Sequence, residues 1–290
     1  MAILRQAGRH AAPIPLADTF LAGWVLSGSG LPVPKGPLTL AISHGAAGPE
    51  IQRDGETEWI LTGTLRRIPW ASKASRIVVL ATDGATPMVA LVDPAACTVT
   101  PGKNLAGEPR DDVAFDDIHL SDSAVQPAGP LVDPRAIHRF GALTRSVLMA
   151  GALETVLAMS IEHANVRQQF GRPIAKFQAV RQQLAVLAGQ VAAATKAADV
   201  ATEAVESGDG RLEIAVAKAR IGEAAGIGAE ISHQVHGAMG ITYEHSLHQY
   251  TRRLWSWRDE FGAETHWQAE IGRRAAAQGP DALWSFISQT

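Results

Sequence analysis

Several residues in the second half of the chain have the chemistry needed to bind a phosphate-containing ligand. Arg167 carries a delocalised, permanently charged guanidinium that suits a pyrophosphate. Gln234 offers amide donors and an acceptor, and Gly237 and Gly240 permit close backbone approach and positive φ. Each also has an ordinary interpretation, as a surface arginine on a helix or as a turn at a helix C-terminus. Their order and spacing therefore matter more than any one of them.

The ten histidines raise the question of a metal site. His233 and His236 are three residues apart on an expected helix, so they share one face. No acidic or histidine partner lies near them in a recognised ligand pattern, and we predict no metal site. The single cysteine, Cys97, excludes an intramolecular disulfide and a cysteine-cluster metal site.

Composition restricts the class of protein. The chain has 290 residues, of which 46% are apolar and 19% charged, as in soluble globular domains. A net charge of −3 gives no indication of a nucleic-acid or membrane-surface binder. No apolar run reaches the roughly 18–20 residues that a membrane span needs. We expect a cytoplasmic protein.

Hydrophobic periodicity divides the chain into three parts. Residues 1–36 contain a helix at about Pro15–Ser29, and residues 37–125 consist of short β-branched runs that predict an antiparallel sheet. From Asp133 to about Ala277 the pattern is helical. The first apolar stripe follows Arg172-Pro173 and consists of Ile174, Phe177, Val180, Leu184, Leu187 and Val191. The second consists of Ile214, Ala217, Ile221, Ala224, Gly228, Ile231 and Val235. Long helices joined by short breaks predict an antiparallel bundle.

Three segments carry a family resemblance. Residues 167–174 and 177–180, which read RQQFGRPI and FQAV, are similar to the R-x-x-F-G-x-P-I and F-Q-x-V stretches of acyl-CoA dehydrogenases. Residues 234–240, QVHGAMG, resemble the family's Q-x-x-G-G-x-G turn, and residues 113–118, VAFDDI, resemble the strand that leaves its β-domain. The segments agree with the family in order and spacing over roughly residues 37–275.

The resemblance implies an α+β fold of the acyl-CoA dehydrogenase type. We expect a shortened N-terminal helical segment (1–36), a small antiparallel β-domain (37–125) and a C-terminal four-helix bundle (126–290). The family cofactor is FAD, held between β-domain and bundle, with its adenosine and pyrophosphate end reaching the adjoining subunit. By this resemblance the cofactor-binding residues are Arg167, Phe170, Gln234 and Gly237. Ala238 stands where the family has glycine.

The catalytic base of the family has no counterpart in this chain. Aligning residues 250–253, YTRR, with the family pattern puts Phe261 where most members carry the catalytic glutamate, and Ala263 replaces the threonine that follows. Glu260 is one residue early, a rotation of about 100° if the segment is helical, and Glu264 lies about one turn later. Some members place the base on the first bundle helix, which corresponds here to Gly141-Ala142.

The region that binds the flavin ring in the family is also altered. The loop that resembles the family's ring-binding loop, residues 41–49, reads AISHGAAGP and lacks its acidic and threonine pattern. Arg67 replaces the flavin-stacking tryptophan, and Pro69, which has neither hydroxyl nor N–H, replaces the hydroxyl donor.

The elements that act within one subunit are thus degraded, whereas those that act across subunits remain. This pattern predicts a subunit of an acyl-CoA dehydrogenase that completes the FAD site of a catalytic paralogue, as in heterotetramers of the family that oxidise fatty-acyl or steroid side-chain thioesters of coenzyme A. One alternative is a self-sufficient homomer that uses Glu260 or Glu264 as base. Another is a flavin-free protein that binds CoA esters or acts as a scaffold. Trp255, Trp257, Phe261 and Trp267 are interpreted as helical core or subunit interface, with an acyl-chain pocket as the alternative.

Overall fold

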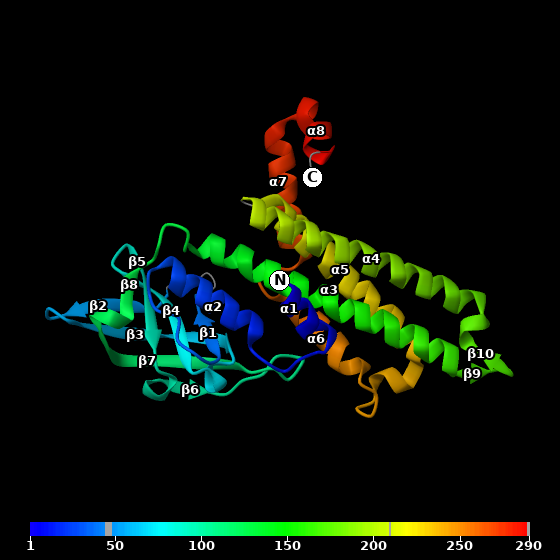
Figure 1. Cartoon of the computed structure of the whole chain (residues 1–290), viewed down its shortest axis with the longest axis horizontal. Helices are drawn as coiled ribbons and strands as arrows, with labels where there is room; N and C mark the ends of the chain where they lie inside the picture. The colour runs from blue at the N-terminus through cyan, green and yellow to red at the C-terminus, as the bar shows by residue number, and fades with distance from the viewer. Residues whose placement is uncertain (44–47, 209, 289–290) are drawn as a thin grey trace. The chain divides into compact units, whose positions relative to one another are not determined.

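The computed structural model describes residues 1–43, 48–208 and 210–288 (Figure 1). The chain forms two compact units: unit 1 consists of Met1–Ala12 and Gly141–Thr290, and unit 2 of Pro13–Phe140. The expected segments 1–36, 37–125 and 126–290 remain an interpretation by family resemblance. The architecture is α+β, as the sequence predicts.

Unit 2 is built on one sheet with the strand order β6-β7-β3-β2-β4-β5-β8, and β1 pairs with β4 beside this path. Leu38–Ala41, Glu50–Asp54, Glu58–Pro69 and Arg76–Asp83 form β1 to β4, and Thr86–Val92, Thr98–Thr100, Arg110–Ser121 and Val125–Pro127 form β5 to β8. The expected first helix is α2 (Leu16–Gly28). Short 3-10 turns lie at Ala71–Lys73 (η1), Pro94–Ala96 (η2) and Asp122–Ala124 (η3).

The expectation of a purely antiparallel sheet is wrong. β1 runs parallel to β4, with Leu38 opposite Arg76, and Glu50 of β2 pairs in parallel with Thr82 of β4. All four residues of β1 are buried, which is the pattern of a strand covered on both faces. Thr19 of α2 lies against β1. Its Oγ1 accepts a hydrogen bond from the Leu38 N–H at 3.0 Å and donates one to the Leu38 carbonyl at 3.1 Å.

Unit 1 is helical. Its helices are α1 (Ala2–Arg9), α3 (Pro134–Val166, which begins in unit 2), α4 (Gln178–Ser207), α5 (Arg211–His236), α6 (Leu247–Asp259), α7 (Glu264–Gln278) and α8 (Leu283–Ser288). Between them lie the two-residue strands β9 (Gln168–Gln169) and β10 (Arg172–Pro173) and the 3-10 turns η4 (Ile174–Lys176), η5 (Gly237–Ile241) and η6 (Pro280–Ala282). These elements confirm the predicted helical half.

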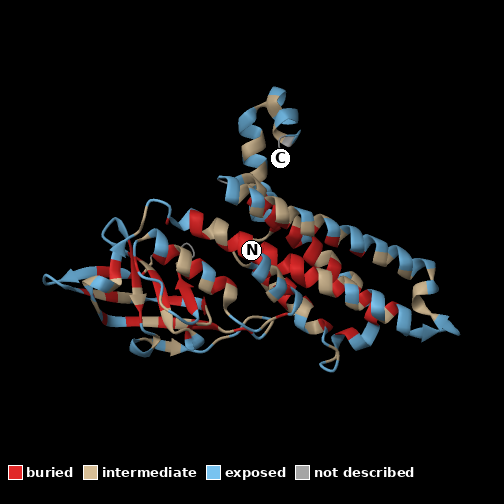
Figure 2. Cartoon of the chain, viewed as in Figure 1, coloured by how far each residue is buried: buried red, intermediate tan, exposed pale blue. Residues whose placement is uncertain are grey.

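The buried residues of the bundle lie mainly on α3 and α5, whereas much of α4 faces solvent (Figure 2). Small residues let these helices approach closely. A Cβ at Gly228 of α5 would lie 2.8 Å from Leu153 of α3 and 3.4 Å from Leu187 of α4, so this position accommodates no side chain without movement. The glycine at position 228 therefore allows α5 to pack closely against α3 and α4.

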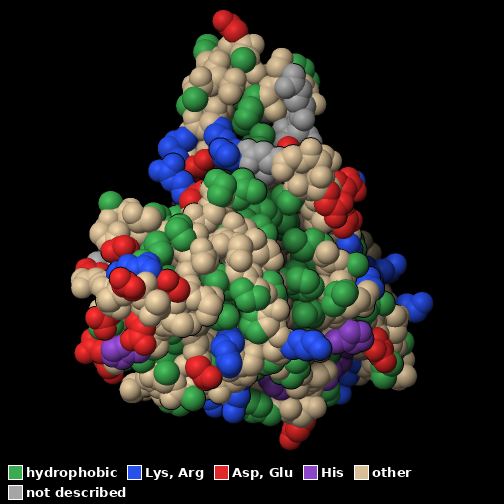
Figure 3. Space-filling view, turned by 60° about the vertical axis from the view of Figure 1, so that its left-hand side comes forward, with side chains coloured by type: hydrophobic (Ala, Val, Ile, Leu, Met, Phe, Trp, Pro, Cys, Tyr) green, Lys and Arg blue, Asp and Glu red, His purple; other side chains and the backbone are tan. Residues whose placement is uncertain are grey.

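Two helices are long and apolar enough to cross a membrane by length and composition alone. They are α3 and α4, whose most apolar windows are 72% and 28% buried, respectively. Core helices of folded proteins pass the same test. The face in Figure 3 carries basic and acidic side chains interspersed, unlike the single-sign surface of a nucleic-acid binder.

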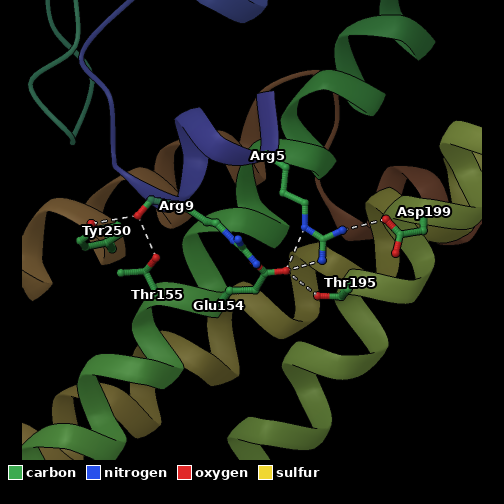
Figure 4. Close-up of polar contacts among 7 residues, drawn as sticks. All are labelled: Arg5, Arg9, Glu154, Thr155, Thr195, Asp199 and Tyr250. Carbon is green, nitrogen blue, oxygen red and sulfur yellow. Dashed lines mark hydrogen bonds and ion pairs between the residues drawn. The ribbon is translucent and has the colours of Figure 1, made fainter. Parts of the chain in front are cut away.

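Helix α1 docks on the bundle through a compact ionic network (Figure 4). Glu154 of α3 accepts hydrogen bonds from Arg5 and Arg9, and the Arg5 Nη1 also lies 2.8 Å from Asp199 of α4. The Arg9 carbonyl accepts hydrogen bonds from Thr155 and Tyr250 at 2.8 and 3.1 Å. Burial raises the pKa of Glu154, but the hydrogen bonds from the two arginines outweigh it and hold that pKa below its usual value.

We expect Glu154→Gln to lower the free energy of unfolding by about 1–3 kcal/mol, since it removes charged acceptors from two guanidinium groups. Because the pKa of Glu154 is lowered in the folded state, its contribution is present at neutral pH and is lost as the pH falls below about 4.5. Urea unfolding at pH 7 measures the change, and hydrogen exchange of the α1 amides reports its location. Glu162→Gln, an exposed glutamate of the same helix, is the matched control. Equal stability of the two variants would contradict the anchoring role.

Candidate functional site

The hairpin that joins α3 to α4 presents Phe170 to solvent. Phe170 and Gly171 separate β9 from β10 and have φ of 52° and 76°, as in a two-residue turn with both central residues left-handed. For a residue with a Cβ, this conformation costs about 1–2 kcal/mol. The Phe170 ring is nevertheless 91% exposed. Strain at an exposed aromatic residue is typical of a position that contacts a ligand or a partner.

Cationic and aromatic groups surround this hairpin. Arg167, the residue after α3, is exposed, and its carbonyl accepts from the Ile174 N–H at 2.8 Å, which closes the base of the hairpin. The Arg172 guanidinium lies 4.4 Å from the ring centre of Phe177, and the Phe170 ring packs edge-on against the same ring at 6.0 Å. The hairpin thus offers the exposed guanidinium groups of Arg167 and Arg172 and an apolar ring at its tip.

The Gln234–Gly240 segment ends α5 and forms η5. Gln234 and Gly237 are exposed, and Gly237 has a φ of 60° with open space around the position of a Cβ. Gly240 is buried and lies outside the positive-φ region, so of the two glycines only Gly237 has the expected conformation. A Cβ at Gly240 would lie 2.9 Å from that of His236, which explains why this position is small.

These two segments meet at the end of the bundle. The ring of His163, one turn before Arg167, stacks on the ring of His236 with their centres 4.4 Å apart. The stacking brings the C-terminal ends of α3 and α5 together, and with them the segments that contain Arg167 and Gln234. Apolar side chains around this end are also exposed, namely Val166, Met239, Ile241 and Tyr243.

Phe261 occupies the position aligned with the family base. It lies in the turn between α6 and α7 with a φ of 54°, so the expected helical rotation of 100° between Glu260 and Phe261 does not apply. A Cβ at Gly141 of α3 would overlap the Phe261 ring. The two positions at which family members are expected to carry their base are therefore neighbours in space, and here they hold a phenyl ring and a hydrogen atom.

Both nearby glutamates are paired with arginines. Glu260 accepts from the Nε of Arg145 at 2.6 Å, and the Arg145 side chain is only 2% exposed. Glu264, at the start of α7, accepts from the Nε of Arg258, whose pKa is raised chiefly by this hydrogen bond. The Arg145 guanidinium also lies 5.5 Å from the centre of the Phe261 ring.

Lys218 of α5 also binds the turn between α6 and α7 that contains Phe261. Its Nζ donates to the carbonyls of Arg258 and Gly262, at 2.6 Å each, and the residue is 1% exposed. Burial lowers the pKa of Lys218 to about 8, against the opposing effect of Glu264, Glu260 and Asp259. Neither Lys218 nor Arg145 belongs to a sequence motif identified above. Lys218 was detectable as a charge beside the apolar stripe, between Ile214 and Ile221.

In unit 2, the segment aligned with the flavin-stacking position is a β-bulge. Arg67 has a φ of 60°, and the pairing of β3 with β7 shifts register between Leu65 and Ile68. The Arg67 N–H donates to Asp112 at 2.9 Å. Pro69, two residues after Arg67, ends β3. Of the altered ring-binding loop, His44–Ala47 lie outside the described residues.

The four aromatic residues of the sequence cluster, Trp255, Trp257, Phe261 and Trp267, lie in different environments. Trp257 and Trp267 are buried, and the indole N–H of Trp267 donates to the Phe261 carbonyl at 3.0 Å. Trp255 stacks on His233, their ring centres 5.6 Å apart. Phe261 packs against Gly141. The core interpretation holds for the two buried tryptophans.

The rings of His233 and His236, considered above as metal ligands, have different partners. His233 packs on Trp255 and His236 on His163. Within the described residues, the geometry of a cation site is met instead by Asp54, Glu58 and His119 of unit 2, whose ligand atoms lie within 4.8 Å of one another. All three are exposed, an arrangement common on protein surfaces without an ion.

Comparison with known proteins agrees with these motifs. Residues 138–274 match the family model "Acyl-CoA dehydrogenase, C-terminal domain". The acyl-CoA dehydrogenase IpdE2 of Mycobacterium tuberculosis is 28% identical over 87% of this chain and 69% of its own length. The acyl-CoA dehydrogenase FadE34 of the same organism is 30% identical over 93% of this chain, which spans only 37% of that protein.

Solved structures extend the similarity to three dimensions. A chain in the crystal structure of the ChsE4-ChsE5 complex from Mycobacterium tuberculosis has a TM-score of 0.82 and 25% identity, over 96% of this chain and 80% of that one. Glutaryl-coenzyme A dehydrogenase in complex with glutaryl-CoA has a TM-score of 0.83 over 93% of this chain and 77% of its own, at 21% identity, which shows the fold alone. From the matched motifs, the family model and the shared fold, residues 138–274 form a C-terminal domain of the acyl-CoA dehydrogenase family, and the chain as a whole is similar to acyl-CoA dehydrogenases.

Proposed function

We propose that this chain is a subunit of an FAD-dependent acyl-CoA dehydrogenase that completes the FAD site of a catalytic paralogue and contributes no base itself. The observation that carries the proposal is the contact between Phe261 and Gly141. Dehydrogenation of an acyl-CoA requires a carboxylate within reach of the proton on the α-carbon. The phenyl ring fills that position, and Glu260 and Glu264 are each paired with an arginine.

The residues at the end of the bundle fit the dinucleotide part of FAD. Arg167 is an exposed guanidinium suited to a pyrophosphate, and Gln234 is an exposed amide. Phe170 offers an apolar ring, and Gly237 has open space where another residue would carry a Cβ. Bound FAD would provide the acceptor for the hydride that leaves the β-carbon of the acyl chain. The role of these four residues is to bind and orient it.

A heteromeric assembly is supported by the pattern of what is kept and lost. The exposed groups around Phe170 and Gly237 are those that the family resemblance places against an adjoining subunit, whereas Arg67, Pro69 and Phe261 replace groups that act within one subunit. A similar chain was crystallised in the ChsE4-ChsE5 complex. We therefore propose a heterotetramer in the cytoplasm with half the FAD of a homotetramer, acting on fatty-acyl or steroid side-chain thioesters.

Co-expression tests the subunit role. We expect the chain purified alone to be colourless or poorly soluble, and the chain co-expressed with a full-length paralogue to give a yellow complex with one FAD per pair of chains. A flavin absorbance spectrum and the mass of the complex measure this. A yellow, active homomer would contradict the proposal, and a stable colourless complex would support the flavin-free alternative.

Within that complex, Arg167→Ala is expected to weaken FAD binding about 10- to 100-fold, because a charged hydrogen bond contributes about 1.5–3 kcal/mol. Fluorescence of released flavin during dilution measures the change. Lys196→Ala, an exposed cation on α4, is the matched control and should leave FAD binding unchanged. Equal affinity in both variants would remove Arg167 from the cofactor site.

The self-sufficient homomer is the second candidate, because Glu260 and Glu264 lie on either side of the base position in the sequence. Under the subunit proposal, Glu260→Gln and Glu264→Gln leave dye-linked dehydrogenation by the complex within about threefold of wild type. Under the alternative, one of them abolishes it, since loss of a base reduces the rate by about 100-fold or more. Urea unfolding of each variant separates loss of activity from loss of fold.

A further inference from the structure

Three imidazoles cluster where α3, α5 and the loop before α6 meet. The ring centre of His236 lies 4.4 Å from that of His163 and 4.8 Å from that of His245, and the first pair is stacked at 26°. His163 and His245 are 6.4 Å apart. We call these three residues the imidazole cluster. Its members come from different elements, so the cluster joins the end of α3 to both sides of the η5 turn.

Hydrogen bonds fix the protonation state in which this arrangement exists. The Nδ1 of His236 lies 2.8 Å from the Ser232 carbonyl, so Nδ1 donates, and in the neutral imidazole Nε2 is an unprotonated acceptor. That Nε2 is buried without a hydrogen-bond partner among the described residues. The Nδ1 of His245 accepts from the Leu247 N–H at 3.2 Å and so caps the start of α6. A proton on His245 Nδ1 would remove this acceptor.

Burial and the neighbouring basic groups oppose protonation of the imidazole cluster. Burial lowers the pKa of His236 to about 4; the Ser232 bond opposes this, and His163, His245 and His233 act in the same direction as burial. Burial also lowers the pKa of His163, followed by effects of His245 and Arg167. Of the other titratable groups on these elements, Glu244 and Tyr243 are exposed on the loop, and His248 of α6 donates to the His245 carbonyl at 2.8 Å.

We propose that the imidazole cluster makes the η5 turn a proton-sensitive element: neutral imidazoles hold the turn closed, and protonation in mild acid opens it. His236 is the last residue of α5 and His245 caps α6, so charging the cluster disturbs the turn at both ends. Resting on the function proposed above, this opening would also release the dinucleotide end of FAD, because Gln234 and Gly237 flank His236.

The expected response follows from linkage. An open turn leaves His236 with its ordinary pKa of 6.5, against about 4 in the closed turn. Lowering the pH from 7.5 to 5.5 should therefore raise the equilibrium constant for opening about tenfold from this one group. Because protonation favours the open form, the contribution of neutral His236 to the closed turn is fully present above pH 6.5 and is lost as the pH falls towards 4.

Hydrogen exchange of the 236–247 amides in the full chain, corrected for the intrinsic pH dependence of exchange, measures the opening without FAD. We expect at least about tenfold loss of protection at pH 5.5 in the wild type, and a smaller response in His245→Asn, which keeps an acceptor for the Leu247 N–H but does not titrate. His119→Asn, an exposed histidine of unit 2, is the matched control and should respond as the wild type does.

Protection that is unchanged between pH 7.5 and 5.5 in the wild type overturns the proposal, whatever the variants do. An unaltered response in a folded His236→Gln variant overturns it as well. The release of flavin from the co-expressed complex over the same pH range is a separate readout. If the turn opens but flavin is retained, the proton-sensitive turn stands and the assignment of Gln234 and Gly237 to the FAD site fails.

Discussion

Two buried cations determine the conformation of the turn between α6 and α7. Arg145 and Lys218 are each almost completely buried, and such groups are tolerated only when partners compensate for their lost hydration. Glu260 provides the partner for Arg145, while the carbonyls of Arg258 and Gly262 provide those for Lys218. These contacts fix Glu260 and the two residues that follow it. The left-handed backbone of Phe261 is a consequence, because the residue lies between two fixed points.

That constraint explains the chemistry that the chain lacks. A glutamate paired with a buried arginine is geometrically committed to that pair, so Glu260 has a structural role. The same reasoning applies to Glu264 beside Arg258. At the other end of the bundle the situation is reversed, because Arg167, Phe170 and Gln234 are exposed. The paired glutamates and the exposed groups thus lie in separate places.

The sequence predicted the helical half well because long apolar stripes depend on local periodicity. The stripe from Ile174 to Val191 and the one from Ile214 to Val235 correspond to α4 and α5. The parallel pairing of β1 was missed, since strand direction depends on contacts far apart in the chain. The position of Phe261 was predicted by alignment, but its neighbour Gly141 became meaningful only when the fold brought the two together. The imidazole cluster was hidden for the same reason.

The fit between Phe261 and Gly141 also has an evolutionary consequence. A carboxylate introduced at position 141 would overlap the phenyl ring, and a glutamate introduced at position 261 would leave the volume of the ring poorly filled beside a bare Gly141. Either substitution would therefore destabilise the turn before it could provide a base. Steric epistasis between the two sites thus opposes the appearance of a carboxylate at either position.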